Sequence, residues 1–289
     1  MNKLAQRLMS FFFGIPIVLS LVLFHRWHHL VLHAAIVFTS FAAVREMYHL
    51  LEKKSPMLPL VPVAVLTLLL PITAWWCASF DRSWEYVVCV LFAVFAALSF
   101  LGIFFSGHRT GDSAEAPFAL SNSRLTSSFF AVFYAGFLIT YLSRLTTLDH
   151  SQEYLVLFFL MVFLCDSSAW LFGVTMGKNN RGLCRVSPNK SAAGFVGGVL
   201  GTGLAVFIGW FLWGPDILPG SPVKLVPLTV CVSLAGIMGD LLESLVKRSS
   251  DSKDSGRLIP GRGGILDSID SILLAAPIYF FCIKFLYDV

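Results

Sequence analysis

Charged side chains are concentrated in one stretch, Gly239–Ser271, of a chain that is otherwise very apolar. Carboxylates bind hard cations, and basic residues beside a glycine-rich turn bind phosphate oxygens. The stretch therefore predicts a site that holds a metal ion and a phosphate chain together. Its acids are Asp240, Glu243, Asp251, Asp254, Asp267 and Asp270, and its bases are Lys247, Arg248, Lys253, Arg257 and Arg262.

The spacing of these residues groups them on helix faces. Asp240, Glu243 and Lys247 are spaced i, i+3 and i+7 and so share one face. Asp267 and Asp270, in the first turns of the next predicted helix, also share a face. Asp240, Asp267 and Asp270 form a set that suits Mg²⁺, which proteins usually bind through a few carboxylates and the substrate's phosphates. With Lys247 beside them, they predict phosphoryl or nucleotidyl transfer at a membrane surface.

Two earlier parts of the chain extend this site. Asp166 lies within an apolar run, where a carboxylate is costly enough to mark a functional position. A structural partner for a neighbouring polar group is the alternative for Asp166. Lys190 lies between Ser187 and Ser191 at the predicted start of a helix, where hydroxyls and unpaired N–H groups can bind a phosphate. The glycines spaced four residues apart that open this helix predict close packing against another helix.

Composition places these residues in a polytopic membrane protein. The 289 residues are 56% hydrophobic and only 13% charged, which is far from the composition of a soluble domain. The six cysteines are scattered without a CxxC pair, so neither a zinc site nor a disulfide framework is predicted. A bilayer-spanning helix needs about 20 mainly apolar residues, and the chain therefore predicts an all-α bundle of about nine transmembrane helices. The predicted spans are roughly 9–25, 28–45, 59–79, 84–105, 127–145, 153–173, 194–213, 225–245 and 265–286.

The basic residues predict the orientation of this bundle, because cytoplasmic loops collect lysine and arginine. With the N-terminus in the cytoplasm, sixteen of the 21 lysines and arginines fall on the cytoplasmic side and five on the other. We therefore expect a cytoplasmic N-terminus and a site that faces the cytoplasm.

The chain divides into two predicted regions. Residues 1–150 are N-terminal transmembrane helices, and residues 151–289 are catalytic transmembrane helices whose cytoplasmic loops carry the site. In the first region, Arg45 and Glu46 are interpreted as anchors at the membrane interface. Four histidines are interpreted as interfacial residues beside a tryptophan, with a metal site as the alternative; they are His25, His28, His29 and His33.

Three motifs of the second region share a specific pattern. The longest is Ser244-x-x-Lys247-Arg248, four residues, Lys253-Asp254-x-Gly256, then Pro260-Gly261-x-Gly263-Gly264-x-x-Asp267-x-x-Asp270. The others are Gly239-Asp240-x-x-Glu243-Ser244, and Ser187-Pro188-x-Lys190 followed by Gly194-Phe195-x-Gly197-Gly198. Together they closely resemble the signature of the phosphatidate cytidylyltransferases, the CDP-diacylglycerol synthases. The N-terminal region resembles this family only in being a bundle of apolar helices.

The resemblance implies an integral membrane nucleotidyltransferase that converts CTP and phosphatidic acid to CDP-diacylglycerol and pyrophosphate in phospholipid biosynthesis. It implies Mg²⁺ as cofactor, and it allows a second, monovalent cation (K⁺) and a homodimer. The enzyme would lie among the lipids of the cytoplasmic or inner cell membrane, with its active site facing the cytoplasm, and would bind no nucleic acid. Together, the resemblance and the spacing predict catalytic residues Asp240, Asp267, Asp270 and Lys247; metal ligands Asp240, Asp267, Asp270 and Asp166; and substrate-binding residues Ser187, Lys190, Ser191, Arg248, Lys253, Asp254, Gly263 and Gly264.

The chain departs from the family pattern at a few positions. Arg262 stands where the family usually has histidine, and Ser268 stands where it usually has arginine. Ser191, Ala192 and Ala193 stand where it tends to have threonine, tryptophan and then an acidic or amide residue. Because a positive charge is lost at 268 and another is gained at 262, we expect the two changes to compensate each other locally.

Two other classes of protein fit parts of the sequence. A CTP-dependent lipid kinase that acts on a polyprenol or a similar alcohol would use the same groups but release CDP. An ion-coupled transporter would use Asp166 and Asp240 as a relay. The transporter is disfavoured because the charges lie toward one side rather than near the midplane, and no inverted repeat is visible.

Overall fold

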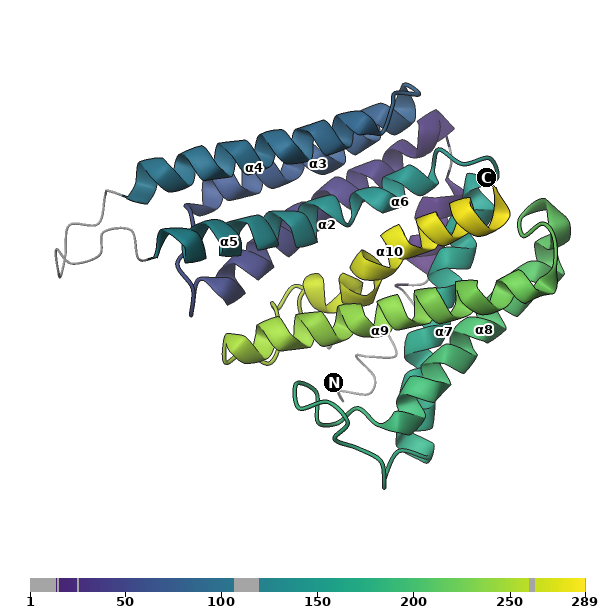
Figure 1. The fold of residues 1–289 in the computed structure, drawn as a ribbon. Coiled ribbons are helices and arrows are strands. Elements are labelled where there is room, and N and C mark those ends of the chain that lie inside the picture. Colours follow the sequence, from purple (N-terminus) through teal and green to yellow (C-terminus); the bar gives the residue numbers. More distant parts are fainter. Residues whose placement is uncertain (1–13, 15, 25, 107–119, 260–262, 289) are drawn as a thin grey trace.

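The computed structural model describes residues 14, 16–24, 26–106, 120–259 and 263–288, and this part of the chain is helical and without β-strands (Figure 1). Eight helical segments in it are long and apolar enough to cross a membrane. The predicted all-α, polytopic membrane fold is confirmed. The helices are α2 (Arg26–Leu51), α3 (Leu60–Ser79), α4 (Glu85–Ser106), α5 (Ser121–Val132), α6 (Thr140–Leu145), α7 (Ser151–Thr175), α8 (Ala192–Trp213), α9 (Leu225–Ser249) and α10 (Leu266–Tyr287).

The eight segments coincide with the second to ninth predicted spans. A π-helical turn, Phe133–Phe137, joins α5 to α6, so that Ser121–Leu145 crosses as one segment. That segment begins several residues before the predicted span 127–145. Of the first predicted span, 9–25, residues 14 and 16–23 are helical, and most of the others lie outside the described residues.

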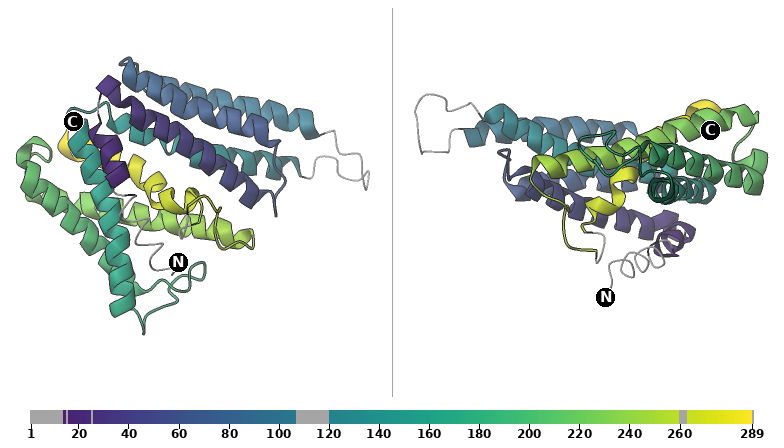
Figure 2. Two further views of the ribbon diagram at one scale, coloured as in Figure 1. Left: turned by 180° about the vertical axis from the view of Figure 1, so that it is seen from behind. Right: turned by 90° about the horizontal axis from the view of Figure 1, so that it is seen from below.

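The helices form two groups joined by a central pair (Figures 1 and 2). Helices α2 to α6 pack together on one side. Helices α7 and α8 pack along each other and run at a steep angle to the rest. The pair α9 and α10 contacts both groups. The charged stretch connects α9 to α10, so it lies where elements from both predicted regions meet.

Buried tyrosines connect α7, α10 and the segment after α8. Tyr154 and Tyr279 are 1% and 0% exposed. The hydroxyl of Tyr279 donates to the carbonyl of Tyr154 at 2.9 Å, and that of Tyr154 donates to the carbonyl of Ile217 at 2.8 Å. Because a buried hydroxyl without a partner is costly, these bonds let large aromatic rings fill the core without that penalty.

Glycines bring α8 against α7, as their spacing predicts. A Cβ atom on Gly197 would collide with the Phe172 side chain, and one on Gly201 would collide with the carbonyl of Leu164 and the side chain of Ser168. Such close backbone approach is the usual reason for glycines spaced four apart in membrane helices. It brings the α7 carboxylate Asp166 close to the start of α8.

Replacing Gly201 by alanine should therefore destabilise the protein by about 1–3 kcal/mol, the usual cost of overpacking. Gly203→Ala is the matched control on the same helix, because its Cβ would lie at an ordinary 3.5 Å from Thr229 Cγ2. Alanine should there stabilise the helix by up to about 1 kcal/mol. Thermal unfolding in detergent compares them, and equal melting temperatures would contradict this account of the packing.

Candidate active site

Lys190 is held in place by a closed loop that ends at the start of α8. The N–H of Gly182 donates to the carbonyl of Lys190 at 3.2 Å, and the N–H of Ala192 donates to the carbonyl of Asn180 at 3.1 Å. Ser191 is the N-cap of α8, since its hydroxyl accepts the N–H of Gly194 at 3.1 Å. The predicted helix start is confirmed, and serine performs the cap at a position where the family tends to have threonine.

A cavity of about 330 Å³ lies beside this helix start. Asp166 of α7, Lys190 and Ser191 before α8, and Asp240 of α9 all line it. Lys190 Nζ is 2.5 Å from Asp240 Oδ2. Four of the predicted site residues therefore meet at one cavity, which combines carboxylates with a cation and a helix N-terminus.

Asp270 joins this group from α10. The glycine before Asp240 allows the contact, because a Cβ on Gly239 would collide with the carbonyl of Asp270. Asp270 is only 9% exposed, and the charges of Asp166, Asp240 and Glu243 act on it. The hydroxyl of the next residue, Ser271, donates a long hydrogen bond of 3.5 Å to Asp166 Oδ1, which links α10 to α7. Carboxylates from three helices thus converge.

Lys247 forms the centre of a second group one to two turns further along α9. Its ammonium contacts Glu243 of the preceding turn and lies 2.6 Å from Asp267 Oδ1. The Glu243 side chain is fully buried, and those of Lys247 and Asp267 are 15% and 7% exposed. The predicted shared face of Asp240, Glu243 and Lys247 therefore points into the protein, and its single lysine is shared between two buried acids.

The loop before α10 fixes the orientation of the Asp267 carboxylate. Its Oδ2 accepts the N–H of Ser255 at 2.9 Å and the N–H of Gly264 at 2.7 Å. Gly263, at φ 113°, needs a backbone conformation that favours glycine. It exchanges two backbone hydrogen bonds with Ile259, which closes the turn. The glycine-rich turn thus delivers one N–H donor, that of Gly264, to this carboxylate, in addition to any role toward phosphate.

The other predicted substrate-binding residues lie at the edge of the site. Arg248, Lys253 and Asp254 are exposed, and among the described residues none of them forms an ion pair. The carbonyl of Ser187 accepts the N–H of Lys190 at 3.0 Å, so Ser187 supports the loop. Arg262 lies outside the described residues, so its expected compensation with Ser268 stays a prediction.

The side chains at this site are of the chemical type that binds a divalent cation. The five carboxyl groups outnumber the basic side chains near them; the acids are Asp166, Asp240, Glu243, Asp267 and Asp270, and the bases are Lys190, Lys247 and Arg181. Buried negative charge in excess favours a bound cation. Within the described residues, however, no three acid, histidine or cysteine side chains are arranged around one point as metal ligands. Asp240 and Asp267 each contact a lysine, which a bound cation would share or displace.

Glu46 of α2 belongs to this site, although its place at the end of an apolar span predicts an anchor at the membrane interface. It is 6% exposed and accepts hydrogen bonds from Ser255 and from the first residues of α10. The position of Glu46 at the end of an apolar span is the sequence feature that points to a functional role. A carboxylate there is costly for the same reason as Asp166.

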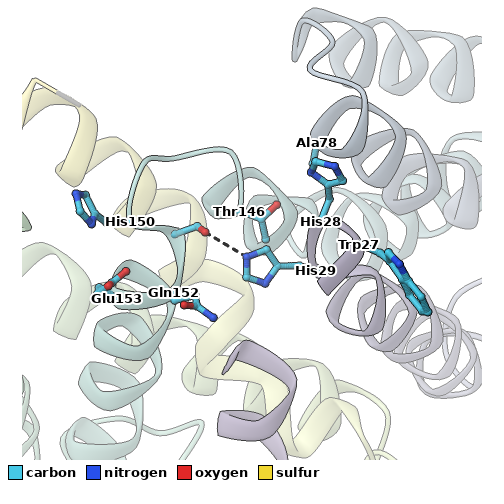
Figure 3. Close-up of a pocket in the computed structure, with 9 residues that line it drawn as sticks. Trp27, His28, His29, Ala78, Thr146, His150, Gln152 and Glu153 are labelled. Carbon is cyan, nitrogen blue, oxygen red and sulfur yellow. Dashed lines mark hydrogen bonds between the residues drawn. The ribbon is translucent and has the colours of Figure 1, made fainter. Parts of the chain in front are cut away.

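Two of the predicted histidines, His28 and His29, line a second cavity of about 650 Å³ at the other end of α2 (Figure 3). His29 Nε2 is 3.2 Å from Ser151 Oγ, and His33 Nδ1 is 3.1 Å from Ser143 Oγ. These contacts connect α2 to α7 and α6. His25 lies outside the described residues, and the described histidines are not grouped as metal ligands.

The fold and the site together define an integral membrane protein with a partly buried cluster of acids and lysines beside a helix N-terminus. A model of the cytidylyltransferase family matches residues 5–286. The chain belongs to this family.

Individual relatives agree with this assignment. The chain is similar to the phosphatidate cytidylyltransferase of Bacillus subtilis, 34% identical over 152 residues, which cover 52% of this chain and 55% of the relative. It is similar to the enzyme of that name from Staphylococcus aureus, 37% identical over 153 residues, covering 50% and 52%. The chain thus spans about half the length of these relatives. A Synechocystis protein of the same name is 26% identical over 313 aligned positions, which cover 98% of both chains.

Proposed function

We propose that the protein is a phosphatidate cytidylyltransferase, which joins CTP and phosphatidic acid to give CDP-diacylglycerol and pyrophosphate for phospholipid biosynthesis. The family match over nearly the whole chain is the observation that carries the proposal. The relatives bear this name. The excess of lysine and arginine on one side supports an active site on the cytoplasmic face of the cell or inner membrane, where CTP is available.

The basic groups suit the phosphates of CTP. Lys190 and the N-terminus of α8 line the cavity, so an anion there would meet an ammonium, N–H groups and the positive end of a helix dipole. Lys247 is already held between two carboxylates. Its contribution would be to neutralise charge that builds up during the reaction. Arg248, exposed in the last turn of α9, and Lys253, exposed on the loop that follows, would meet the outer phosphates.

The carboxylates suit Mg²⁺. Asp240, Asp267 and Asp270 would hold it, assisted by Asp166, and K⁺ as a second cation fits the same surplus of negative charge. When bound, Mg²⁺ supplies charge neutralisation on the phosphate oxygens and orients the triphosphate. Lys190, which pairs with Asp240, and Lys247, which pairs with both Glu243 and Asp267, are the ammonium groups nearest these carboxylates and would face the substrate phosphates beside them.

The reaction needs positioning more than proton transfer. A phosphate oxygen of phosphatidic acid attacks the α-phosphorus of CTP, the bond to the β-phosphate oxygen breaks, and pyrophosphate leaves. Because the lipid phosphate is already ionised near neutral pH, no strong general base is required. Lys190 and Lys247 balance the added charge, and burial of the site strengthens their effect.

The purified protein, incubated with radiolabelled CTP, Mg²⁺ and phosphatidic acid in mixed micelles, should form a labelled lipid and release pyrophosphate. Asp251→Asn, on the exposed part of the loop, is a matched control that should keep this activity. Transfer to a polyprenol with release of CDP would favour the lipid kinase instead. No nucleotide-dependent product with either lipid would end the proposal.

A further inference from the structure

Glu46 is a buried carboxylate that reaches from the N-terminal helices to the start of α10. Its Oε1 accepts the N–H of Ile265 at 3.0 Å, and its Oε2 accepts the N–H of Leu266 at 2.9 Å. Its Oε2 also accepts the hydroxyl of Ser255 at 2.9 Å. All three donors belong to the charged stretch, so α2 supplies an acceptor for the segment that carries Asp267.

Ser255 connects Glu46 to Asp267 directly. Its hydroxyl oxygen is 2.9 Å from Glu46 Oε2 and also 2.9 Å from Asp267 Oδ2. A hydroxyl has one proton, so it can donate to only one of these carboxylates at a time. The same oxygen is 3.3 Å from the N–H of Asp267, which can donate to it. One serine thus contacts both the carboxylate and the backbone of Asp267 while it is bonded to Glu46.

The loop has room for Glu46 only because two of its residues are glycines. A Cβ on Gly256 or on Gly264 would collide with the Glu46 carboxylate. Two exposed contacts, which add little stability, also join this loop to the segment after α2: Lys54 Nζ lies 2.5 Å from Asp251 Oδ2, and Lys53 Nζ donates to Ser252 Oγ at 2.7 Å. The backbone of the charged stretch therefore packs closely around the Glu46 side chain, which comes from the N-terminal region.

A simple helix cap does not explain this arrangement. A serine, threonine or aspartate at the N-cap position would satisfy the first N–H groups of α10 at low cost, and that position is occupied by Ile265. A carboxylate buried from a distant helix costs desolvation energy, offset here by three donors and by the positive end of the α10 dipole. What this placement adds is a rigid connection to Asp267.

We propose that Glu46 is a positioning residue, which acts through Ser255 and the first N–H groups of α10 to hold the Asp267 carboxylate in the orientation that binds a divalent cation. The inference deepens the proposed function and rests on Asp267 being a metal ligand in it. Metal-ligating carboxylates depend on such outer partners, whose loss typically weakens metal binding by about 10–100-fold.

The test is Glu46→Gln, which keeps the shape of the side chain but replaces one acceptor oxygen with an NH₂ donor facing N–H or O–H donors. Mn²⁺ binding, followed by electron paramagnetic resonance on the purified full-length protein without substrate, should weaken by about tenfold or more. Glu52→Gln is the control, because Glu52 follows the same helix but its side chain is exposed and contacts His49. Its Mn²⁺ affinity should equal that of the unmodified protein.

Unchanged Mn²⁺ affinity in folded Glu46→Gln would overturn the proposal, as would a wild-type protein that binds no Mn²⁺. Ser255→Ala gives a second test that leaves the Ser255 N–H to Asp267 in place, and it should also weaken binding. Because both residues act along one chain of contacts, the double variant should lose little more than the worse single variant. If the loss of Mn²⁺ affinity in the double variant equalled the sum of the two single losses, Glu46 and Ser255 would not act through the same contacts.

Failure of the inference can be told apart from failure of the proposed function. A wild-type protein that forms CDP-diacylglycerol while Glu46→Gln binds Mn²⁺ normally refutes only the role of Glu46. A wild-type protein that forms no CDP-lipid while Glu46→Gln loses Mn²⁺ affinity refutes only the activity.

Discussion

Asp267→Asn should lower cytidylyl transfer by about a thousandfold, the scale of losing one group that stabilises transition-state charge, and should leave the protein folded. The asparagine carbonyl can take the place of Oδ2 and accept the N–H groups of Ser255 and Gly264, so the loop keeps its anchor. The NH₂ group then faces Lys247 in place of Oδ1. The site loses one negative charge at the point where the proposed Mg²⁺ would bind. Initial rates across a range of Mg²⁺ concentrations measure the effect.

Asp251→Asn provides the matched control for this experiment. The Lys54 ammonium beside Asp251 lowers the pKa of that carboxyl, so asparagine removes a full negative charge there too. Asp251 is exposed and lies on the same loop, and its variant should keep nearly normal rates. Near-normal turnover in Asp267→Asn would remove Asp267 from the active site, whereas equal losses in both variants would indicate a general electrostatic effect.

Those parts of the fold and site that depend on local spacing could be predicted from the sequence. The period of an α-helix puts Asp240, Glu243 and Lys247 on one face, and apolar length predicts where helices cross. The start of α8 beside Lys190 and its close packing on α7 follow from a serine cap and from glycines four residues apart. Each of these inferences involves residues within one continuous stretch of the sequence.

Contacts between distant elements could not be predicted in the same way. The bond between Ser255 and Glu46 joins residues 209 positions apart. This hydrogen bond forms because α2 packs beside the start of α10, and no local sequence pattern predicts that packing. The spacing of the acids also did not show that Asp267 would contact Lys247 while Asp240 contacts Lys190. Pairing in a buried site depends on which side chains reach one another in three dimensions, since an acid left without a partner there is costly.

Lys247→Met should destabilise the folded protein by about 3–5 kcal/mol, the usual cost of removing one partner of a buried ion pair. Methionine matches the length of the lysine stem but leaves Glu243, whose side chain is fully buried, without its ammonium. Asp267 also loses an ion pair but keeps its two N–H donors. Thermal unfolding in detergent should show the loss, and an unchanged melting temperature would contradict a buried ion pair at this position.

The double variant Glu243→Leu/Lys247→Met separates the structural role of Lys247 from its catalytic role. Replacing a buried ion pair with apolar side chains of similar volume is often neutral or stabilising, so the double variant should recover most of the lost stability. It should not recover turnover, because a proposed phosphate-neutralising ammonium is still missing. A double variant that is both stable and active would show that Lys247 only balances the buried charge of Glu243. A stable but inactive one would support a direct role for this ammonium in the transfer of the cytidylyl group.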